Sequence, residues 1–130
     1  MKTVLLIDDN EFLLNVMVQW VNFQLPDCRI LVAFNGRDGL EILKKNSVDL
    51  IVTDLHMPVM DGFAFIERKN SVCPDTPLIV MTSDYSSEVM KRLSALGVTQ
   101  CMEKPFKFEL LIDKLQEVMQ GDRSRDVVPA

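Results

Sequence analysis

Residues 48–62 read VDLIVTDLHMPVMDG, and this stretch decides the fold class. It begins with a short apolar run, Val48–Thr53, made of the residue types that buried strands prefer. The run ends abruptly at Asp54, and the loop after it contains Pro58 and closes at Gly62. A strand that is apolar on both faces must be covered from both sides. The stretch therefore predicts an interior strand of a layered domain, with a carboxylate at the end of the strand.

Four more short apolar runs occur along the chain, and helical patterns alternate with the five runs. The other expected strands are Thr3–Ile7, Arg29–Phe34, Pro77–Thr82 and Thr99–Glu103. The expected helices are Glu11–Phe23, Gly36–Asn46, Gly62–Asn70, Ser87–Leu96 and Phe106–Met119. Strands that alternate with helices favour a parallel sheet with helices on both faces and right-handed crossovers. We therefore expect an α/β fold with a doubly wound five-stranded parallel sheet.

The length of 130 residues fits one domain, which we place at residues 1–120. Residues 121–130 mix charge, Gly and Pro without periodicity, and we interpret them as a flexible tail or the start of a linker. The net charge of −5 argues against direct binding of nucleic acid or an anionic membrane. No apolar run approaches the length of a membrane helix. Three cysteines without metal-site spacing indicate free thiols, so we expect a cytoplasmic protein.

Polar side chains stand at the ends of four of the five expected strands. They are Asp8 and Asp9 after the first strand, Asp54 after the third, Thr82 at the end of the fourth and Lys104 after the fifth. The carboxyl ends of parallel strands lie along one edge of the sheet, where ligands of such folds bind. The strand pattern therefore predicts that three carboxylates, one hydroxyl and one ammonium converge in one cleft.

This set of groups suits phosphoryl transfer. Three clustered carboxylates repel one another unless a cation lies among them, and a hard ion such as Mg²⁺ prefers oxygen ligands. One carboxylate can then act as the nucleophile and form an aspartyl phosphate. The ammonium and the hydroxyl can stabilise the other phosphoryl oxygens.

The same residues resemble the response regulator receiver family of two-component and phosphorelay signalling. The matching motifs are Asp8-Asp9, the segment 53–62 (TDLHMPVMDG), Thr82-Ser83 and Lys104-Pro105, and the resemblance covers about residues 2 to 120. It implies a flavodoxin-like fold with strand order 2-1-3-4-5, the order known from chemotaxis receivers. A cis Lys104–Pro105 peptide bond is also common in this family.

The resemblance assigns a role to each site residue. Asp54 resembles the phosphoacceptor, and Asp8, Asp9, Asp54 and the backbone carbonyl of His56 resemble the groups that hold Mg²⁺. Thr82 and Lys104 resemble the residues that contact the phosphoryl group and take part in the conformational switch. Cys101 is atypical, because many receivers have an aromatic residue at this position. A cysteine is too small to sweep the same volume, so the aromatic half of the switch is in doubt.

Simpler interpretations stay open for several of these residues. Asp8, Asp9 and Asn10 could serve only to cap the first helix. His56 is the only histidine, and it could influence attack of water on the phosphoryl group, although we do not interpret it as a phosphohistidine. The wide apolar arc of the first helix is either a scatter of exposed apolar residues or a docking surface for the phosphodonor.

The expected function is a signalling module without turnover of an external substrate. The expected partners are a histidine kinase or histidine phosphotransfer protein and a downstream effector or fused output domain. One alternative is a Mg²⁺-dependent aspartyl-phosphate phosphatase or phosphotransferase. Such enzymes usually place a second acid two residues after the nucleophile, where this chain has His56. A phosphorylation-independent interaction domain is the other alternative, although the intact set of site residues argues against it.

Overall fold

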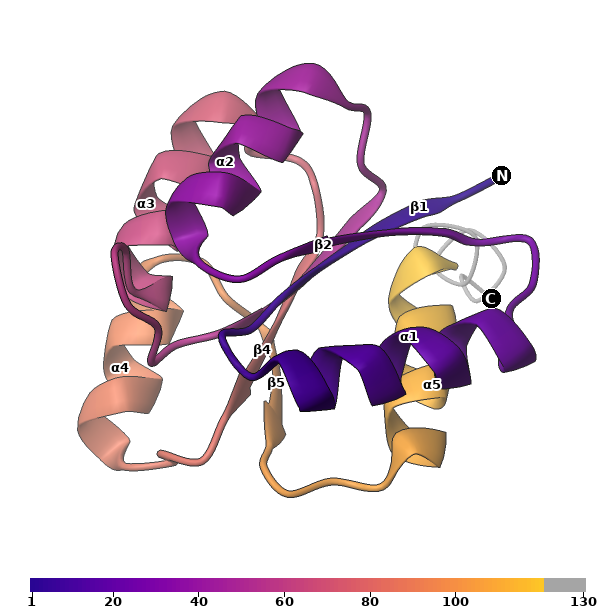
Figure 1. The fold of residues 1–130 in the computed structure, drawn as a ribbon. Helices are drawn as coiled ribbons and strands as arrows, with labels where there is room; N and C mark the ends of the chain where they lie inside the picture. Colours follow the sequence, from indigo (N-terminus) through magenta and orange to yellow (C-terminus); the bar gives the residue numbers. More distant parts are fainter. Residues whose placement is uncertain (121–130) are drawn as a thin grey trace, which may run out of the picture.

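The computed structural model describes residues 1–120 and shows a five-stranded parallel sheet in the order β2-β1-β3-β4-β5, with helices on both faces (Figure 1). The strands are β1 (Thr3–Ile7), β2 (Arg29–Ala33), β3 (Leu50–Asp54), β4 (Leu78–Thr82) and β5 (Gln100–Glu103). The helices are α1 (Glu11–Gln24), α2 (Gly36–Lys45), α3 (Gly62–Val72), α4 (Ser87–Ala95) and α5 (Phe108–Met119). The predicted fold and strand order are confirmed. The predicted tail, residues 121–130, lies outside the described residues.

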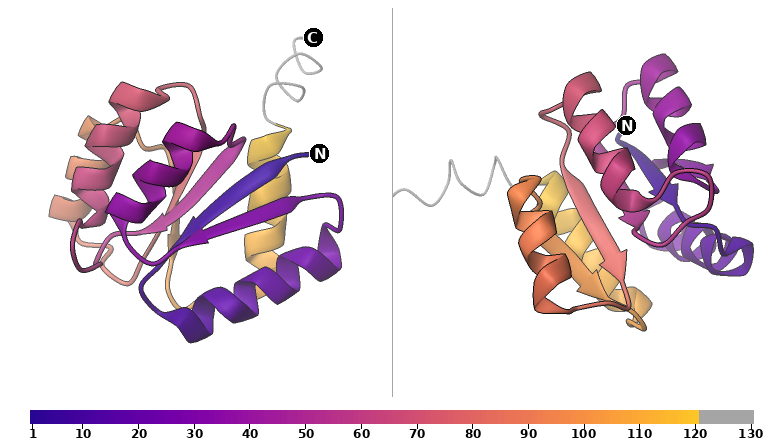
Figure 2. Two further views of the ribbon diagram at one scale, coloured as in Figure 1. Left: turned by 45° about the horizontal axis from the view of Figure 1, so that its top comes forward. Right: turned by 90° about the vertical axis from the view of Figure 1, so that its left-hand side faces the viewer.

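The sheet separates two apolar cores. Helices α2, α3 and α4 cover one face and α1 and α5 cover the other, as the two views of Figure 2 show. Because side chains alternate along a strand, Leu5 and Ile7 of β1 enter the first core while Val4 and Leu6 enter the second. β1 and β3 are buried on both faces, which explains why their sequences are continuous apolar runs.

Two elements begin two residues later than the sequence pattern predicts, while β4 and β5 begin one residue later. β3 begins at Leu50, because Asp49 turns back towards β1 and its carboxylate accepts a hydrogen bond from the Thr3 backbone N–H at 2.8 Å. α5 begins at Phe108 and not at Phe106. The Phe108 ring stacks on Trp20 of α1 with 5.7 Å between ring centroids, and Phe106 packs edge-on against Phe108. These aromatic contacts fix the approach to α5 before the helix begins.

Within residues 1–120, no helix has both the length and the apolar character needed to cross a membrane.

Candidate functional site

Three carboxylates meet at the carboxyl edge of the sheet. Asp8 and Asp9 follow β1, and Asp54 is the last residue of the neighbouring strand β3. Each offers an oxygen that lies within 4.8 Å of those of the other two. Asp8 and Asp54 are buried while Asp9 is exposed, so the cluster opens towards solvent on the Asp9 side. The structure thus brings together the three acids that the strand pattern placed at one edge.

Lys104 joins this cluster from the end of β5, on the other side of β4. Its Nζ donates to Oδ2 of Asp8 at 2.7 Å and to Oδ2 of Asp54 at 3.1 Å. Partial burial acts to lower the pKa of Lys104, but the hydrogen bonds and negative charges of Asp8 and Asp54 outweigh it, so the pKa is raised. Lys104 therefore remains an ammonium and offsets part of the charge of the acidic cluster.

Of the three residues that could cap the first helix according to the sequence, Asn10 is the one that does so. Its side chain accepts a hydrogen bond from the Leu13 N–H at 3.0 Å and so caps α1. Asp8 holds this turn, because its Oδ1 accepts from the Asn10 N–H at 2.9 Å. Asp9 is not the cap of α1, and its pKa is raised, first by desolvation and then by the charge of Asp8. Its carboxylate thus faces the cluster in an environment that disfavours the charged form.

The backbone around Asp54 orients its carboxylate. Oδ1 accepts from the Leu55 N–H at 2.7 Å, while Oδ2 accepts from Lys104. The Gly62 N–H donates to the Leu55 carbonyl at 2.8 Å and so packs the first residue of α3 against the strand end. A Cβ on Gly62 would lie 2.5 Å from the Asp54 carbonyl oxygen. The glycine in the predicted motif therefore allows the close approach that fixes Asp54.

Thr82 ends β4 beside this site and is fully buried. Asp54 pairs with Met81 in the β3–β4 register, which places Thr82 one residue further toward the same edge. The Thr82 hydroxyl accepts from the Asp84 N–H at 3.0 Å, and the Thr82 carbonyl accepts from the Lys104 N–H at 2.8 Å. Thr82 is thus tied both to Lys104 and to the loop that leads to α4.

The remaining predicted positions surround this site. His56 is exposed in the loop after β3, and the role of its backbone carbonyl as a metal ligand stays a prediction. The Lys104–Pro105 peptide bond is cis, as the family resemblance implied. Cys101 on β5 is partly buried, and burial is the main reason that its pKa is raised. A raised pKa leaves less of the reactive thiolate at neutral pH.

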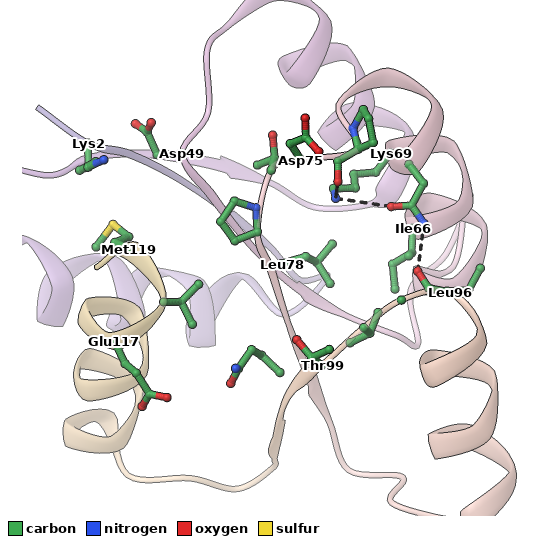
Figure 3. A pocket seen from close by; sticks show the side chains of 18 residues that line it. Lys2, Asp49, Ile66, Lys69, Asp75, Leu78, Leu96, Thr99, Glu117 and Met119 are labelled. Atoms are coloured by element: carbon green, nitrogen blue, oxygen red, sulfur yellow. Dashed lines mark hydrogen bonds between the residues drawn. The ribbon is translucent and has the colours of Figure 1, made fainter. Parts of the chain in front are cut away.

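Sequence reasoning missed two residues, Tyr85 and Lys69. Tyr85 lies in the loop between β4 and α4, where hydrophobic periodicity does not predict the direction of a side chain. Lys69 lies on α3 and lines a cavity of about 960 Å³ at the opposite edge of the sheet (Figure 3). This cavity is larger than the apolar pocket that adjoins Lys104, but it has no cluster of converging catalytic groups among residues 1–120. Lys69 lies on the same face of the helix as the apolar residues Phe65 and Ile66, and this spacing predicts a buried position. The charge of lysine argues against burial and therefore hides this signal.

The sequence profile of the response regulator receiver domain matches residues 4–116. The chain belongs to the response regulator receiver family. It is 29% identical over 115 residues to the "Probable C4-dicarboxylate response regulator DctR" of Priestia megaterium, covering 88% of this chain and 50% of that protein. It is 34% identical over 103 residues to the "Autoinducer 1 sensor kinase/phosphatase LuxN" of Vibrio campbellii, covering 79% of this chain and 12% of that protein. The chain thus spans half or less of these two relatives.

Solved receiver structures have the same architecture. The chemotaxis response regulator CheY4 of Vibrio cholerae superposes with a TM-score of 0.81 at 32% identity, covering 91% of this chain and 98% of that chain. A CheY-like receiver domain protein from Methanospirillum hungatei superposes with a TM-score of 0.89 at 22% identity, covering 96% of this chain and 98% of that chain. At this identity the likeness supports the fold alone. Receivers of this family accept phosphoryl groups in two-component signalling and generally bind Mg²⁺ in an acidic pocket. This receiver has the corresponding aspartate cluster.

Proposed function

We propose that this receiver accepts a phosphoryl group on Asp54 from a histidine kinase or histidine phosphotransfer protein, and that the reaction depends on Mg²⁺. The main supporting observation is the pair of hydrogen bonds from Lys104 to Asp8 and Asp54. They join residues 96 and 50 positions apart in the sequence into one site. A cation already bridges the acidic cluster in the way that a phosphoryl acceptor requires.

The residues present fit Mg²⁺. Asp8, Asp9 and Asp54 offer only carboxylate oxygens, and the backbone carbonyl of His56 would supply a fourth protein oxygen. The raised pKa of Asp9 indicates that this carboxylate has no compensating cation of its own. Bound Mg²⁺ would supply positive charge for the carboxylates and for the oxygens of the incoming phosphoryl group.

The side chains have distinct tasks in the transfer. Asp54 is the nucleophile, so that a bond forms between its carboxylate oxygen and phosphorus while the bond from phosphorus to the donor nitrogen breaks. The Leu55 N–H holds Oδ1 in place, and Oδ2 faces the ammonium of Lys104. Lys104 and the Thr82 hydroxyl then contact the oxygens of the transferred group, which carry its negative charge.

The phosphodonor has a suitable docking surface beside the site. A small apolar pocket of about 450 Å³ adjoins Lys104 and is lined by Leu13, Pro105, Phe106 and Phe108. Phe12 in the first turn of α1 is 78% exposed, and Glu11 is the only charged residue of this helix. We propose that the pocket and the start of α1 receive a helical surface of the donor, and that a downstream effector or output domain responds to phosphorylation. Exposed apolar patches of this kind mark interaction sites.

This receiver is proposed to turn over no external substrate, with reaction confined to its own phosphorylation and dephosphorylation. An aspartyl-phosphate phosphatase usually has a second acidic residue, Asp or Glu, two positions after the nucleophile. The position two residues after Asp54 holds His56, whose side chain is exposed to solvent.

Mass spectrometry after incubation with acetyl phosphate and Mg²⁺ tests the proposal. We expect the wild-type chain to gain one phosphoryl group that is stable in acid and labile in base. Asp54→Asn should gain none, and chelation of Mg²⁺ should abolish the gain in the wild type. A phosphoryl group that persists on Asp54→Asn would contradict the assignment, and Asp61→Asn, which alters the cap of α3 outside the acidic cluster, is the matched control.

A further inference from the structure

Lys69 is a buried cation in the wall of the cavity at the edge of the sheet opposite Asp54. Its side chain is 4% exposed, and Figure 3 shows it on the same side of the cavity as Leu96. Its Nζ donates to the Pro74 carbonyl at 3.3 Å and to Oδ1 of Asn70 at 3.4 Å, and both hydrogen bonds are longer than usual. No acidic side chain of residues 1–120 forms a salt bridge with it. An ammonium has three N–H donors, so Lys69 retains the capacity to donate to one more acceptor.

The cavity around Lys69 has an apolar wall. Four apolar side chains line the cavity and belong to the first apolar core or pack against it: Ile66, Leu78, Leu96 and Val98. The amide of Asn70 is already engaged, because its Nδ2 donates to the Leu96 carbonyl at 3.1 Å. A molecule that reaches Lys69 therefore meets one cation and an apolar surface.

Three acidic side chains line the same cavity, but none of them neutralises Lys69 by direct contact. Asp49 accepts a hydrogen bond from the Thr3 N–H at 2.8 Å, and Asp75 and Glu117 are exposed to solvent. Solvent and salt screen such exposed charges. What remains of their repulsion grows with the charge of an approaching anion, so they disfavour a multiply charged anion more than a singly charged one.

We propose that this cavity binds a small organic acid, a monocarboxylate with an apolar chain, whose carboxylate pairs with Lys69 and whose chain packs against the apolar wall. The cavity volume of about 960 Å³ suits a ligand of this size. An uncompensated buried charge destabilises the fold, and a carboxylate in contact with the ammonium would supply the missing partner. Desolvation lowers the pKa of Lys69, and a bound carboxylate would raise it again. The cavity lies far along the strands from the acidic cluster, so this site is separate from the proposed phosphoacceptor site.

Titration with hexanoate, followed by backbone amide shifts, tests whether the cavity binds such an acid. We expect saturable shifts at Asn70, Leu96 and Val98. Hexan-1-ol has a chain of the same length without the charge, and it should bind about tenfold more weakly or less, because a hydrogen bond between charged groups is lost. Inorganic phosphate should also bind more weakly than hexanoate, since it has no chain to pack against the wall and carries more charge.

Variants assign the binding to Lys69. Lys69→Met and Lys69→Gln remove the charge and should each weaken hexanoate binding by about tenfold or more. Lys2→Met is the matched control, because it removes an exposed lysine that lines the same cavity, and it should leave the affinity unchanged. The absence of saturable shifts with hexanoate would overturn the proposal, and so would tighter binding of phosphate. Equal affinity for hexanoate and hexan-1-ol, unchanged affinity in both Lys69 variants, or an equal loss in Lys2→Met would also overturn it.

Discussion

Asp9 is the exposed member of the acidic cluster, and its raised pKa has a consequence for stability. A carboxylate whose pKa is higher in the folded state destabilises that state at pH values above its ordinary pKa of 3.8. This destabilisation disappears as the pH falls and the carboxylate becomes protonated. We expect Asp9→Asn to raise the free energy of unfolding at pH 7 without Mg²⁺. The gain should be less than about 1 kcal/mol, because solvent screens an exposed charge. Urea denaturation of the two proteins measures it.

In the presence of Mg²⁺ the wild type should be more stable than Asp9→Asn. A ligand that binds only the folded state stabilises it, by about 2.7 kcal/mol at a hundredfold excess over the dissociation constant. The wild type should therefore gain thermal stability as Mg²⁺ is added, and Asp9→Asn should gain much less. An equal gain in both proteins would show that Asp9 does not hold the ion.

Lys69 is a buried cation without an acidic partner within 4 Å in residues 1–120. It is 4% exposed, and its Nζ donates only to the Pro74 carbonyl at 3.3 Å and to Asn70 Oδ1 at 3.4 Å. Desolvation lowers its pKa below the ordinary 10.5. Replacing a poorly compensated buried charge by an apolar group of similar size is often stabilising. We expect Lys69→Met to raise the free energy of unfolding by about 1 kcal/mol at pH 7.

The pH dependence distinguishes this charge effect from better packing. The cost of burying the Lys69 ammonium is fully present below its folded pKa, shrinks as the pH rises towards 10.5, and is gone above 10.5, where the amine is neutral in both states. The advantage of Lys69→Met should therefore shrink as the pH is raised from neutrality towards 10.5, as measured by urea denaturation. If the stability difference between Lys69→Met and the wild type does not change with pH, better packing alone explains the higher stability of the variant.

At the scale of elements, the close contact of α3 with β3 depends on Gly62. A Cβ there would lie 2.5 Å from the Asp54 carbonyl oxygen and 2.6 Å from the Leu55 Cα, which are backbone atoms that cannot rotate away. We expect Gly62→Ala to lower the free energy of unfolding by about 3 kcal/mol, at the upper end of the usual cost of overpacking. It should also slow phosphorylation of Asp54, because the helix start fixes the strand end.

Gly97 provides the matched control for this substitution. It adopts a φ of +84° between α4 and β5, with nothing within 4 Å of an added Cβ. Asn accepts this backbone conformation more readily than other residues, so Gly97→Asn should cost less than about 1 kcal/mol. If Gly97→Asn is phosphorylated at the wild-type rate, the slower phosphorylation of Gly62→Ala is caused by the contact of the added Cβ with the Asp54 backbone. An equal defect in both variants would contradict this explanation.

The sequence predicted the type and order of the ten elements because each is a run with a distinct hydrophobic period. It could not predict where β3 and α5 begin. Those limits depend on the Asp49 hydrogen bond to Thr3 and on the stacking of Phe108 with Trp20, which join segments distant in sequence. Local periodicity contains no information about such contacts.

Across the whole molecule, Lys104 connects the acidic cluster to Thr82 at the end of β4. Its Nζ contacts Asp8 and Asp54, while its backbone N–H donates to the Thr82 carbonyl. We expect Lys104→Ala to take up beryllofluoride more weakly but to lose the changes at α4, because a contact that differs between the two states is gone. Backbone amide shifts of both proteins measure the effect, and a full set of shifts around Tyr85 and α4 in the variant would contradict the coupling role.

The sequence predicted those residues of the site that follow from one rule, namely that the carboxyl ends of parallel strands lie along the same edge of the sheet. This rule placed Asp8, Asp9, Asp54, Thr82 and Lys104 together. It could not show which of Asp8, Asp9 and Asn10 caps α1. The cap depends on side-chain directions in a loop, where no periodic rule applies. The roles assigned to these residues stay predictions until the experiments above are done.

The Lys104 bridge also has a consequence for synthesis on the ribosome. Asp8 and Asp54 emerge early, but the ammonium that compensates them follows β5, the final strand of residues 1–120, and is 96 and 50 residues later in the sequence. A nascent chain that stops before β5 must bury two acids without their cation, which is costly. Premature termination should therefore leave fragments that fail to close the sheet and become protease substrates. The acidic cluster can therefore form only when the domain is complete.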